Sequence, residues 1–413
     1  MKQKFSRDFN LVLIGQIISL FGASILKFSL SLYILDITGS AVIFGSILAI
    51  SSIPILIFSP IGGAIADRFN KRNLMVIFDF TSCFIITLLA LALFMDKGSV
   101  IIVGIIMTAL SVISTMYQPV VQASIPILTD EKQLFRANGL VSSVSALTSF
   151  LGPIVGALLY GALGINSIVI MSAVSFFFSA VMEIFIHIPF EKTKYQFNII
   201  KTIASDMKEG FLYIIKNDSF IVKAMSMAAI LNLFVTPLVI VGLPYIIKIF
   251  LGLSSQHYGF TQGALGIGMI LGAISIGSVS KKLQVKTIYK LVFILAICLL
   301  PISFVTTTFF NIPVFVSYSV ITISAIIIMF FVTILNIYVL TAVQKKTPNA
   351  LLGKVMAILI AVSNCAAPIG QALFGALFEM PNQYIFIVVF GVALISFITA
   401  IITKKITRNE SEL

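Results

Sequence analysis

Twelve long apolar stretches, separated by short polar segments, run along the chain. They lie at residues 9–36, 41–66, 74–95, 99–125, 135–163, 165–188, 220–247, 255–280, 287–308, 312–344, 349–379 and 383–403. A helix crosses the hydrocarbon core of a bilayer with about 20 apolar residues. A transmembrane β-strand would instead alternate in polarity over about ten residues, and runs such as residues 88–94 do not alternate. We therefore predict an all-α membrane protein with twelve transmembrane helices.

The longest polar stretch divides six predicted spans from six. It covers residues 189–219 and includes the segment FNIIKTIASDMKEGFLYIIK, whose pattern is typical of an amphipathic helix on a membrane surface. We predict an N-terminal six-helix half at 1–188, a cytoplasmic linker with an amphipathic helix at 189–219, and a C-terminal six-helix half at 220–413.

The two halves carry similar residues at a nearly constant offset. Three pairs of residues are 214 positions apart and a fourth pair is 215 apart. The pairs are Ser40 and Ser254, Gly45 and Gly259, Gly63 and Gly277, and Pro153 and Pro368. Internal repeats are the building units of transporter folds, whose solute site lies between the repeats near the membrane midplane. The offset therefore predicts two pseudo-symmetric halves.

Charged residues make up only 10% of the chain, but lysine and arginine outnumber the acids, which gives a formal net charge of +12. With a cytoplasmic N terminus, 23 of the 27 lysines and arginines fall on the cytoplasmic side of the predicted spans. Cytoplasmic loops are enriched in these residues. The charge therefore indicates membrane topology rather than nucleic-acid binding, and we expect both termini in the cytoplasm.

The loop between the second and third predicted spans carries a motif with glycine, acid and basic residues at fixed spacing. Its residues are Gly63, Asp67, Arg68, Lys71 and Arg72. The motif resembles the signature of the major facilitator superfamily, which implies two six-helix halves, transport by alternating access, and a role for these residues as a conformational latch. In the second half, Lys281 stands where the first copy has Asp67. We therefore expect only the first copy to act as an anionic latch.

The fifth predicted span contains Gly152, Pro153 and Gly156, which resemble an element found in the exporters of that superfamily. Its small residues and proline predict a kink-prone helix on which the halves pack and pivot. Three further features are similar to the macrolide-efflux and siderophore-exporter branch: the segment from Asp36 to Ser40 before the second span, Asp79 early in the third and Pro119 in the fourth. The resemblance implies a bacterial cytoplasmic membrane protein. One departure is that span 99–125 lacks the arginine found there in many proton-coupled drug exporters.

Polar residues form a stripe along the fourth predicted span at spacings of 3, 4, 3 and 4, which places them on one helical face. The stripe consists of Thr108, Ser111, Thr115, Gln118 and Gln122. In the superfamily that the chain resembles, spans 1, 4, 7 and 10 line the central cavity. Further cavity candidates are therefore Gln16, Ser19 and Lys27 in span 1, Asn232 and Thr236 in span 7, and Thr322, Thr333 and Asn336 in span 10. Hydrogen bonding between helices is the alternative interpretation.

Few charges lie inside the predicted spans. Lys27 is placed deepest, where a lysine costs about 2.5 to 3.5 kcal/mol on insertion scales, so it is expected to face the cavity. There it binds an anionic group of the substrate or titrates during the cycle, or else it snorkels or pairs with Asp36 or Glu379. These two acids, together with Asp79 and Glu183, are candidates for ion coupling, with solvated helix ends as the alternative.

Taken together, these features predict a secondary active transporter that exports an amphipathic, drug-like or siderophore-like molecule. No nucleotide-binding loop, redox motif, metal-ligand pattern or nucleophile elbow occurs in the sequence, so we predict no enzyme activity, no cofactor and no metal. The expected partners are a small-molecule substrate and the lipid bilayer, with protons as the candidate coupling ion; we expect a monomer. An uptake carrier or a lysophospholipid flippase of the same fold, or a non-transporting receptor or scaffold, are the alternatives.

Overall fold

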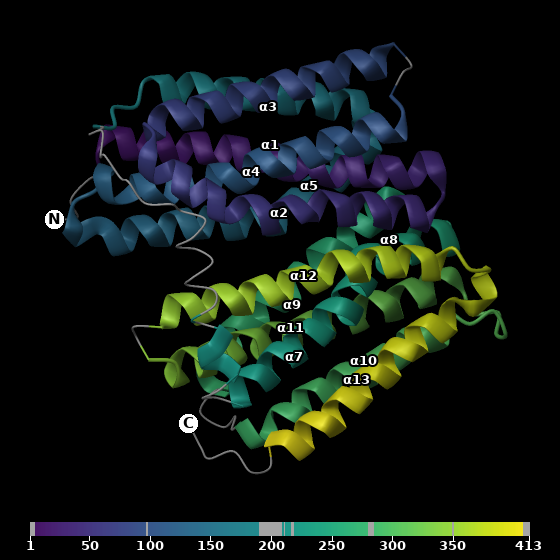
Figure 1. Ribbon diagram of the computed structural model, residues 1–413. Helices are drawn as coiled ribbons and strands as arrows, with labels where there is room; N and C mark the ends of the chain where they lie inside the picture. Colours follow the sequence, from purple (N-terminus) through teal and green to yellow (C-terminus); the bar gives the residue numbers. More distant parts are fainter. Residues whose placement is uncertain are drawn as a thin grey trace. The chain divides into compact units, whose positions relative to one another are not determined.

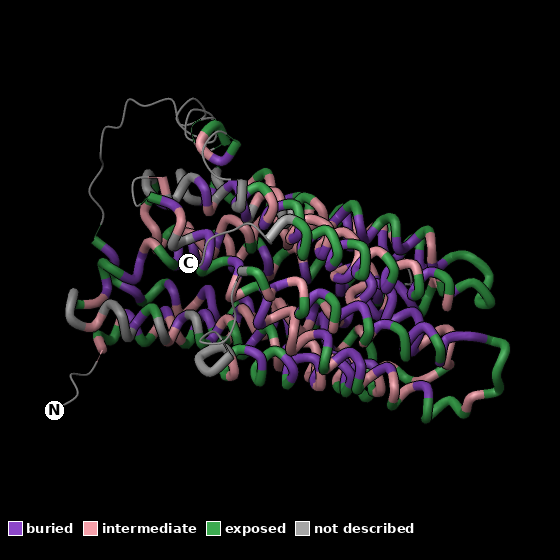
Figure 2. Tube along the Cα trace, turned by 90° about the horizontal axis from the view of Figure 1, so that it is seen from below, coloured by how far each residue is buried: buried purple, intermediate pink, exposed green. Residues whose placement is uncertain are grey.

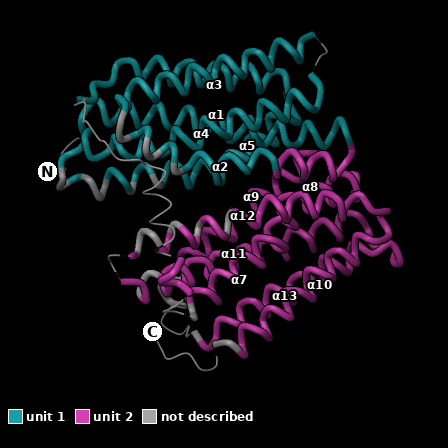
Figure 3. Tube along the Cα trace, in the orientation of Figure 1, with its two compact units in different colours: residues 1–38, 50–199 teal, residues 39–49, 200–413 magenta. Residues whose placement is uncertain are grey.

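The computed structural model describes residues 5–95, 98–189, 209, 211–215, 219–279, 285–348 and 351–407 (Figure 1). Within these ranges all regular secondary structure is helical. The chain forms two compact units, shown in different colours in Figure 3. Unit 1 comprises Met1–Thr38 and Ile50–Ile199, and unit 2 comprises Gly39–Ala49 and Ile200–Leu413.

Unit 1 is built from five helical elements, although the first residues of α2 belong to unit 2. The elements are α1 (Arg7–Thr38), α2 (Ala41–Arg68), α3 (Lys71–Phe94), α4 (Val100–Leu128) and α5 (Glu131–Ile184). Helix α5 consists of two consecutive helices, because Gly164, with φ 73° and ψ 175°, has a non-helical backbone conformation between them. Glycine adopts a positive φ without the steric penalty of a Cβ atom. Gly164 therefore separates the predicted spans 135–163 and 165–188.

Unit 2 contains a similar series of helices. They are α7 (Ser219–Pro237), η1 (Leu238–Gly242), α8 (Leu243–Tyr245), η2 (Ile246–Phe250), α9 (Ser255–Val279), η3 (Val285–Thr287), α10 (Ile288–Val305), α11 (Val314–Lys346), α12 (Leu352–Phe378), η4 (Asn382–Tyr384) and α13 (Ile385–Thr407). The first four follow one another without a break, so that α7 continues through two π-helical turns as far as Phe250.

The prediction of an all-α membrane protein is confirmed. Each of the twelve predicted ranges contains helix within the described residues. By length and composition, nine helical segments of the described chain could cross a membrane, and one of these, Ser143–Ile184, holds two predicted spans. The number twelve is therefore compatible with the helices but is not an exact count. Most of the predicted linker at 189–219 lies outside the described residues, although residues 211–215 are described and helical.

Large apolar side chains cover the outer faces of the helices. Buried and exposed positions follow one another along each helix (Figure 2). Ile101 on α4 and Ile274 on α9 are each 73% exposed. Exposed apolar surface on this scale is rare on soluble monomers, and in a membrane protein it faces lipid.

Helix α5 packs along α1 through small residues, which let two helices approach closely. Three buried serines join the helices by donating to backbone carbonyls across the contact. They are Ser29 to Gly156 at 3.2 Å, Ser172 to Gly22 at 3.3 Å and Ser179 to Gly15 at 3.1 Å. The α1–α5 contact is therefore held by hydrogen bonds along much of its length.

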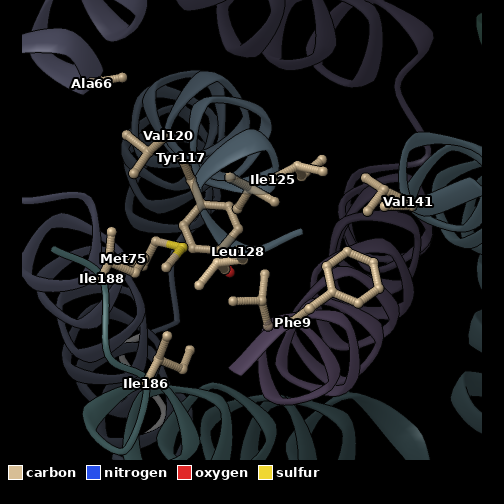
Figure 4. Close-up of a cluster of buried hydrophobic side chains, with 13 residues drawn as sticks. Phe9, Ala66, Met75, Tyr117, Val120, Ile125, Leu128, Val141, Ile186 and Ile188 are labelled. Carbon is tan, nitrogen blue, oxygen red and sulfur yellow. The ribbon is translucent and has the colours of Figure 1, made fainter. Parts of the chain in front are cut away.

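An apolar cluster fills the end of unit 1 at which α1 begins (Figure 4). It draws residues from α1 to α5 and from the segment that follows α5: Phe9, Val12, Ala66, Met75, Tyr117, Val120, Val121, Ile125, Leu128, Ala137, Val141, Ile186 and Ile188. Figure 4 shows Met75, Leu128 and the ring of Tyr117 directed toward one another. Tyr117 is the member of this end cluster that also reaches a polar site, described below.

Candidate functional site

Unit 1 contains a cavity of about 530 Å³, within the range of pockets that hold small molecules. Its apolar wall includes Leu20, Leu30, Ile55, Met107, Leu110, Ile113 and Phe176. Its polar lining consists of Ser19, Lys27, Ser59, Asp79, Ser82, Ser111, Ser114, Thr115, Tyr117, Gln118 and Gln122. The cavity therefore combines a largely apolar wall with polar groups that come mainly from α4.

The structure brings most of the candidates predicted in spans 1 and 4 onto this cavity. Ser19, Lys27, Ser111, Thr115, Gln118 and Gln122 all line it. Two candidates do not. Gln16 is fully buried, and Thr108 donates a hydrogen bond of 2.8 Å to the carbonyl of Gly104 on its own helix. The sequence stripe on α4 is thus one residue longer than its cavity-facing part.

Helix α4 contains a proline, Pro119, beside the cavity. Pro119 has no N–H, so the carbonyl of Thr115 loses its helical donor. The Thr115 hydroxyl donates to the Ser111 carbonyl at 2.7 Å. Gly62 of α2 packs on the same turn, since a Cβ atom there would lie 2.9 Å from the Cα atom of Met116. The Thr115 carbonyl lies on this packed side of the helix, since a Cβ atom on Gly62 would be 3.3 Å from its oxygen.

Lys27 is exposed where it lines the cavity, and it has no ion pair within the described part of the chain. The two acids proposed as its partners bond elsewhere. Asp36 accepts from the Tyr160 hydroxyl at 2.7 Å. Glu379 accepts from the Ser40 hydroxyl at 3.0 Å and from the backbone N–H of Val42 at 3.2 Å, all within unit 2. The arrangement thus leaves the Lys27 ammonium available to a bound molecule.

Two of the candidate coupling acids lie together in the interior of unit 1. Asp79 on α3 is 2% exposed and Glu183 on α5 is fully buried, and their carboxyl groups interact electrostatically. The Tyr117 hydroxyl donates to Glu183 at 2.6 Å and also contacts the Ser19 hydroxyl. These two acids are therefore not solvated helix ends. Sequence reasoning missed Tyr117, whose position beside Gln118 on the α4 stripe was the available signal.

The motif after α2 is only partly described. The side chains of Asp67 and Arg68, and the surroundings of Gly63, lie outside the described set, as does Asn349. Lys71 is partly buried, and Arg72 donates to the carbonyl of Ile184 at the end of α5. Arg72 thus ties the start of α3 to the end of α5 within unit 1. The latch itself stays a prediction.

The export-type element lies where α5 meets α1. A Cβ atom on Gly152 would lie 2.1 Å from the Ser24 hydroxyl oxygen, and one on Gly156 would lie 3.2 Å from the carbonyl oxygen of Ile25. Pro153, between them, is half-buried. The described contacts of both glycines are thus with α1 of the same unit, where an added methyl group would overlap Ser24 at Gly152 and would be tight at Gly156.

The cavity candidates of unit 2 mostly bond within or next to their own helices. Asn232 donates to the Ala228 carbonyl at 3.0 Å and accepts from Thr236 at 3.2 Å. Thr322 pairs with Thr261 at 3.1 Å, and Thr333 donates to the Met329 carbonyl at 2.8 Å. Asn336 is exposed. These residues do not belong to the cavity of unit 1.

Comparison with known proteins agrees with this architecture. The chain is 23% identical over 263 residues to macrolide efflux protein A of Streptococcus pyogenes, a match covering 64% of each chain and so less than two thirds of that relative. Its fold is similar to the POT family transporter PepTSo, with a TM-score of 0.70, 12% identity and 98% of each chain covered. It is also similar to a bacterial homologue of the iron transporter ferroportin, with a TM-score of 0.69, 14% identity and coverage of 97% and 100%.

The family assignment rests on a match that spans most of the chain. The sequence profile of the Major Facilitator Superfamily matches residues 12–358. The all-helical fold, the apolar outer surface and the signature at Gly63 to Arg72 are those of a multi-pass membrane transporter rather than an enzyme. The chain belongs to the Major Facilitator Superfamily.

Proposed function

We propose that this transporter is a secondary carrier that exports an amphipathic small molecule across the bacterial cytoplasmic membrane by alternating access. The observation that carries the proposal is the cavity of unit 1, in which an exposed lysine lies beside a largely apolar wall. Efflux relatives at 23% identity support the direction of transport. A molecule with a hydrophobic body and a polar group matches this combination.

Lys27 indicates which polar group the substrate carries. Its ammonium has no ion pair within the described residues and faces the cavity. A hydrogen bond to a charged group is worth about 1.5 to 3 kcal/mol. We therefore propose that Lys27 binds an anionic group of the substrate, while the side-chain amides of Gln118 and Gln122 donate or accept further hydrogen bonds.

The proposed orientation has both termini in the cytoplasm. The distribution of lysine and arginine along the chain supports it. In a cysteine-free background, single cysteines at Gly39 and Gly164, which lie in the breaks after α1 and inside α5, are expected to react with an impermeant thiol reagent from outside. A cysteine at Asn70 is expected to stay unlabelled in intact cells. Labelling of a cysteine at Asn70 from outside would show that the proposed orientation is wrong.

The latch motif belongs to the same proposal. Asp67 is proposed to stabilise the state closed to the cytoplasm, because a carboxylate is favoured near the positive N-terminal end of a helix. Asp67→Asn is then expected to lower the transport rate without loss of protein from the membrane. Transport at the wild-type rate by purified Asp67→Asn would rule out the role of Asp67 as a latch.

Export can be tested in everted membrane vesicles with a panel of anionic, zwitterionic and cationic amphipathic compounds, including a macrolide. Wild-type vesicles are expected to accumulate an anionic member of the panel in the presence of an ion gradient and without dependence on ATP. Accumulation in intact cells instead would show an uptake carrier. No transport of any compound in either direction would contradict the proposal.

A further inference from the structure

The interior of unit 1 holds two acids in a place where carboxylates are costly. Asp79 and Glu183 project from α3 and α5 into the region where these helices meet α1 and α4, and both are at least nine-tenths buried. Gly15 of α1 lies close by, since a Cβ atom there would be 3.8 Å from the Glu183 side chain. A buried ionised carboxylate is stable only when it is paired and hydrogen-bonded.

The hydrogen bonds of the two acids are incomplete. One oxygen of Glu183 accepts from the Tyr117 hydroxyl at 2.6 Å. The Glu183 Oε2 atom and the Asp79 Oδ2 atom are buried without a partner among the described residues. The Ser179 hydroxyl lies against Asp79 but donates to the Gly15 carbonyl at 3.1 Å. Two carboxylate oxygens of the pair thus lack a donor among the described residues.

Among the described side chains, no cation of the surrounding helices forms an ion pair with either acid. On α1, Lys27 lines the cavity but makes no ion pair in the described part of the chain, and Arg7, Asp8 and Asp36 lie near the helix ends. On α3, Arg72 donates to the Ile184 carbonyl and Lys71 begins the helix. Helix α4 contains no lysine, arginine or acid. On α5, Glu131, Lys132 and Arg136 lie near the start of the helix and Tyr160 contacts Asp36.

Two like charges in such a place oppose each other. Among described residues, the ionisable groups that interact with Glu183 are Asp79 and Tyr117, and neither is a cation. Two carboxylates that share a site favour a state in which one of them carries a proton. The pair is therefore suited to hold one proton.

The cavity gives this proton a route. Asp79 lines the cavity whereas Glu183 is not part of its lining, so water in the cavity reaches Asp79 first. On the other side, Tyr117 belongs both to the end cluster and to the hydrogen bond with Glu183. The apolar end cluster, of which Tyr117 is a member, also contains Phe9 and Val12 from the start of α1 (Figure 4).

We propose that Asp79 and Glu183 together bind one proton, that Tyr117 positions Glu183, and that this proton is the coupling ion of the transport cycle. The inference rests on the proposed function and names its coupling site. On uptake, a proton from cavity water forms an O–H bond with one carboxylate oxygen, and the charge of the pair falls from two negative charges to one. On release that bond breaks and the proton returns to water, with no oxidation or reduction.

The site can be tested without a substrate, by infrared pH titration of the purified protein in lipid. A band of the protonated carboxyl C=O group is expected to disappear as the pH rises. The double variant Asp79→Asn/Glu183→Gln should abolish this titrating band, and each single variant should change its midpoint. Asp130→Asn, an exposed acid before α5, is the matched control and should leave the titration unchanged. The amides have the size of the acids and imitate the protonated state, so the variants are expected to fold.

Tyr117→Phe separates a positioning role from a merely structural one. Loss of the donor removes a hydrogen bond that favours ionised Glu183, so the midpoint is expected to move to higher pH by about one unit. An unchanged titration midpoint in this variant would show that Tyr117 does not position Glu183. A wild-type titration in the double variant would overturn the proposal, as would loss of the band on adding sodium ions at constant pH, which would indicate a metal-cation site.

The same variants link the site to transport. The double variant is expected to exchange substrate across proteoliposomes but to lose accumulation driven by a pH gradient. A failure of export in vesicles would leave the infrared result intact, because that measurement needs no substrate. Accumulation by the double variant at the wild-type level would contradict the assignment of the coupling ion.

Discussion

Corresponding helix pairs of the two units differ in chemistry. At the offsets of 214 and 215 that relate the repeats, Asp79 falls at Phe293 and Glu183 falls at Phe397 or Ile398. The acids are buried between α3 and α5, whereas the two phenylalanine rings lie 5.2 Å apart on α10 and α13 and are 37% and 39% exposed. Neither α10 nor α13 contains an aspartate or a glutamate.

The comparison shows that α10 and α13 pack together as α3 and α5 do, but that they carry no counterpart of the two buried acids. The same asymmetry appears in the motif after the second helix of each half, where Asp67 corresponds to Lys281. We therefore expect charge-dependent steps of transport to depend on unit 1 and to tolerate changes at matched positions of unit 2.

The largest effect is expected from removing the cavity charge of unit 1. Lys27→Met keeps the length of the side chain and should lower transport of an anionic substrate about 10- to 100-fold, the equivalent of about 1.5 to 3 kcal/mol. Lys290→Met changes an exposed lysine of α10 in unit 2 and should have no such effect. Initial rates in everted vesicles at equal protein abundance measure both. Equal losses of transport rate in the two variants would contradict the expected difference between the two units.

A smaller effect is expected from the glycines that set helix packing. Gly152→Ala places a methyl group against Ser24 in the α1–α5 contact, so it should lower the free energy of unfolding by about 1 to 3 kcal/mol. Gly391→Ala in α13 meets open space and should be neutral or stabilising by up to about 1 kcal/mol, because alanine favours helix. Thermal unfolding in detergent compares the two. Greater destabilisation by Gly391→Ala would contradict the described packing.

The smallest effect is expected from the aromatic pair of unit 2. Phe293→Leu removes the contact with Phe397 but keeps an apolar side chain, so the cost in unfolding free energy should be about 0.5 to 1.5 kcal/mol. The pH dependence of transport should not change. A pH profile altered as strongly as in Glu183→Gln would show that unit 2 also contributes to coupling.

Much of the fold could be predicted from the sequence because hydropathy reports directly on membrane spans. The break at Gly164 was predicted by the boundary between two apolar stretches, and the α4 stripe followed from helical spacing. Both features depend only on residues that are close together in the sequence, so a single sequence is enough to predict them.

The carboxyl site could not be assembled in this way because its parts are far apart in sequence. Tyr117 and Glu183 are separated by 66 positions, and only the packing of α4 against α5 brings them within 2.6 Å. Glu183 lies at the end of its predicted span, so its position suggested solvent, yet α1 and α4 cover it. Conversely, Gln16 and Thr108 have the spacing of cavity residues but do not line the cavity, since Gln16 is fully buried and Thr108 bonds to a carbonyl of its own helix.

Proton movement coupled to the substrate tests the central claim most directly. Energised everted vesicles that contain a pH-sensitive dye can be given the compound identified by the export assay. Wild type and Asp130→Asn are expected to release protons from the vesicle lumen as the compound enters, whereas Asp79→Asn/Glu183→Gln should release none. Proton release by the double variant at the wild-type rate, or substrate accumulation by wild type without proton release, would contradict the account.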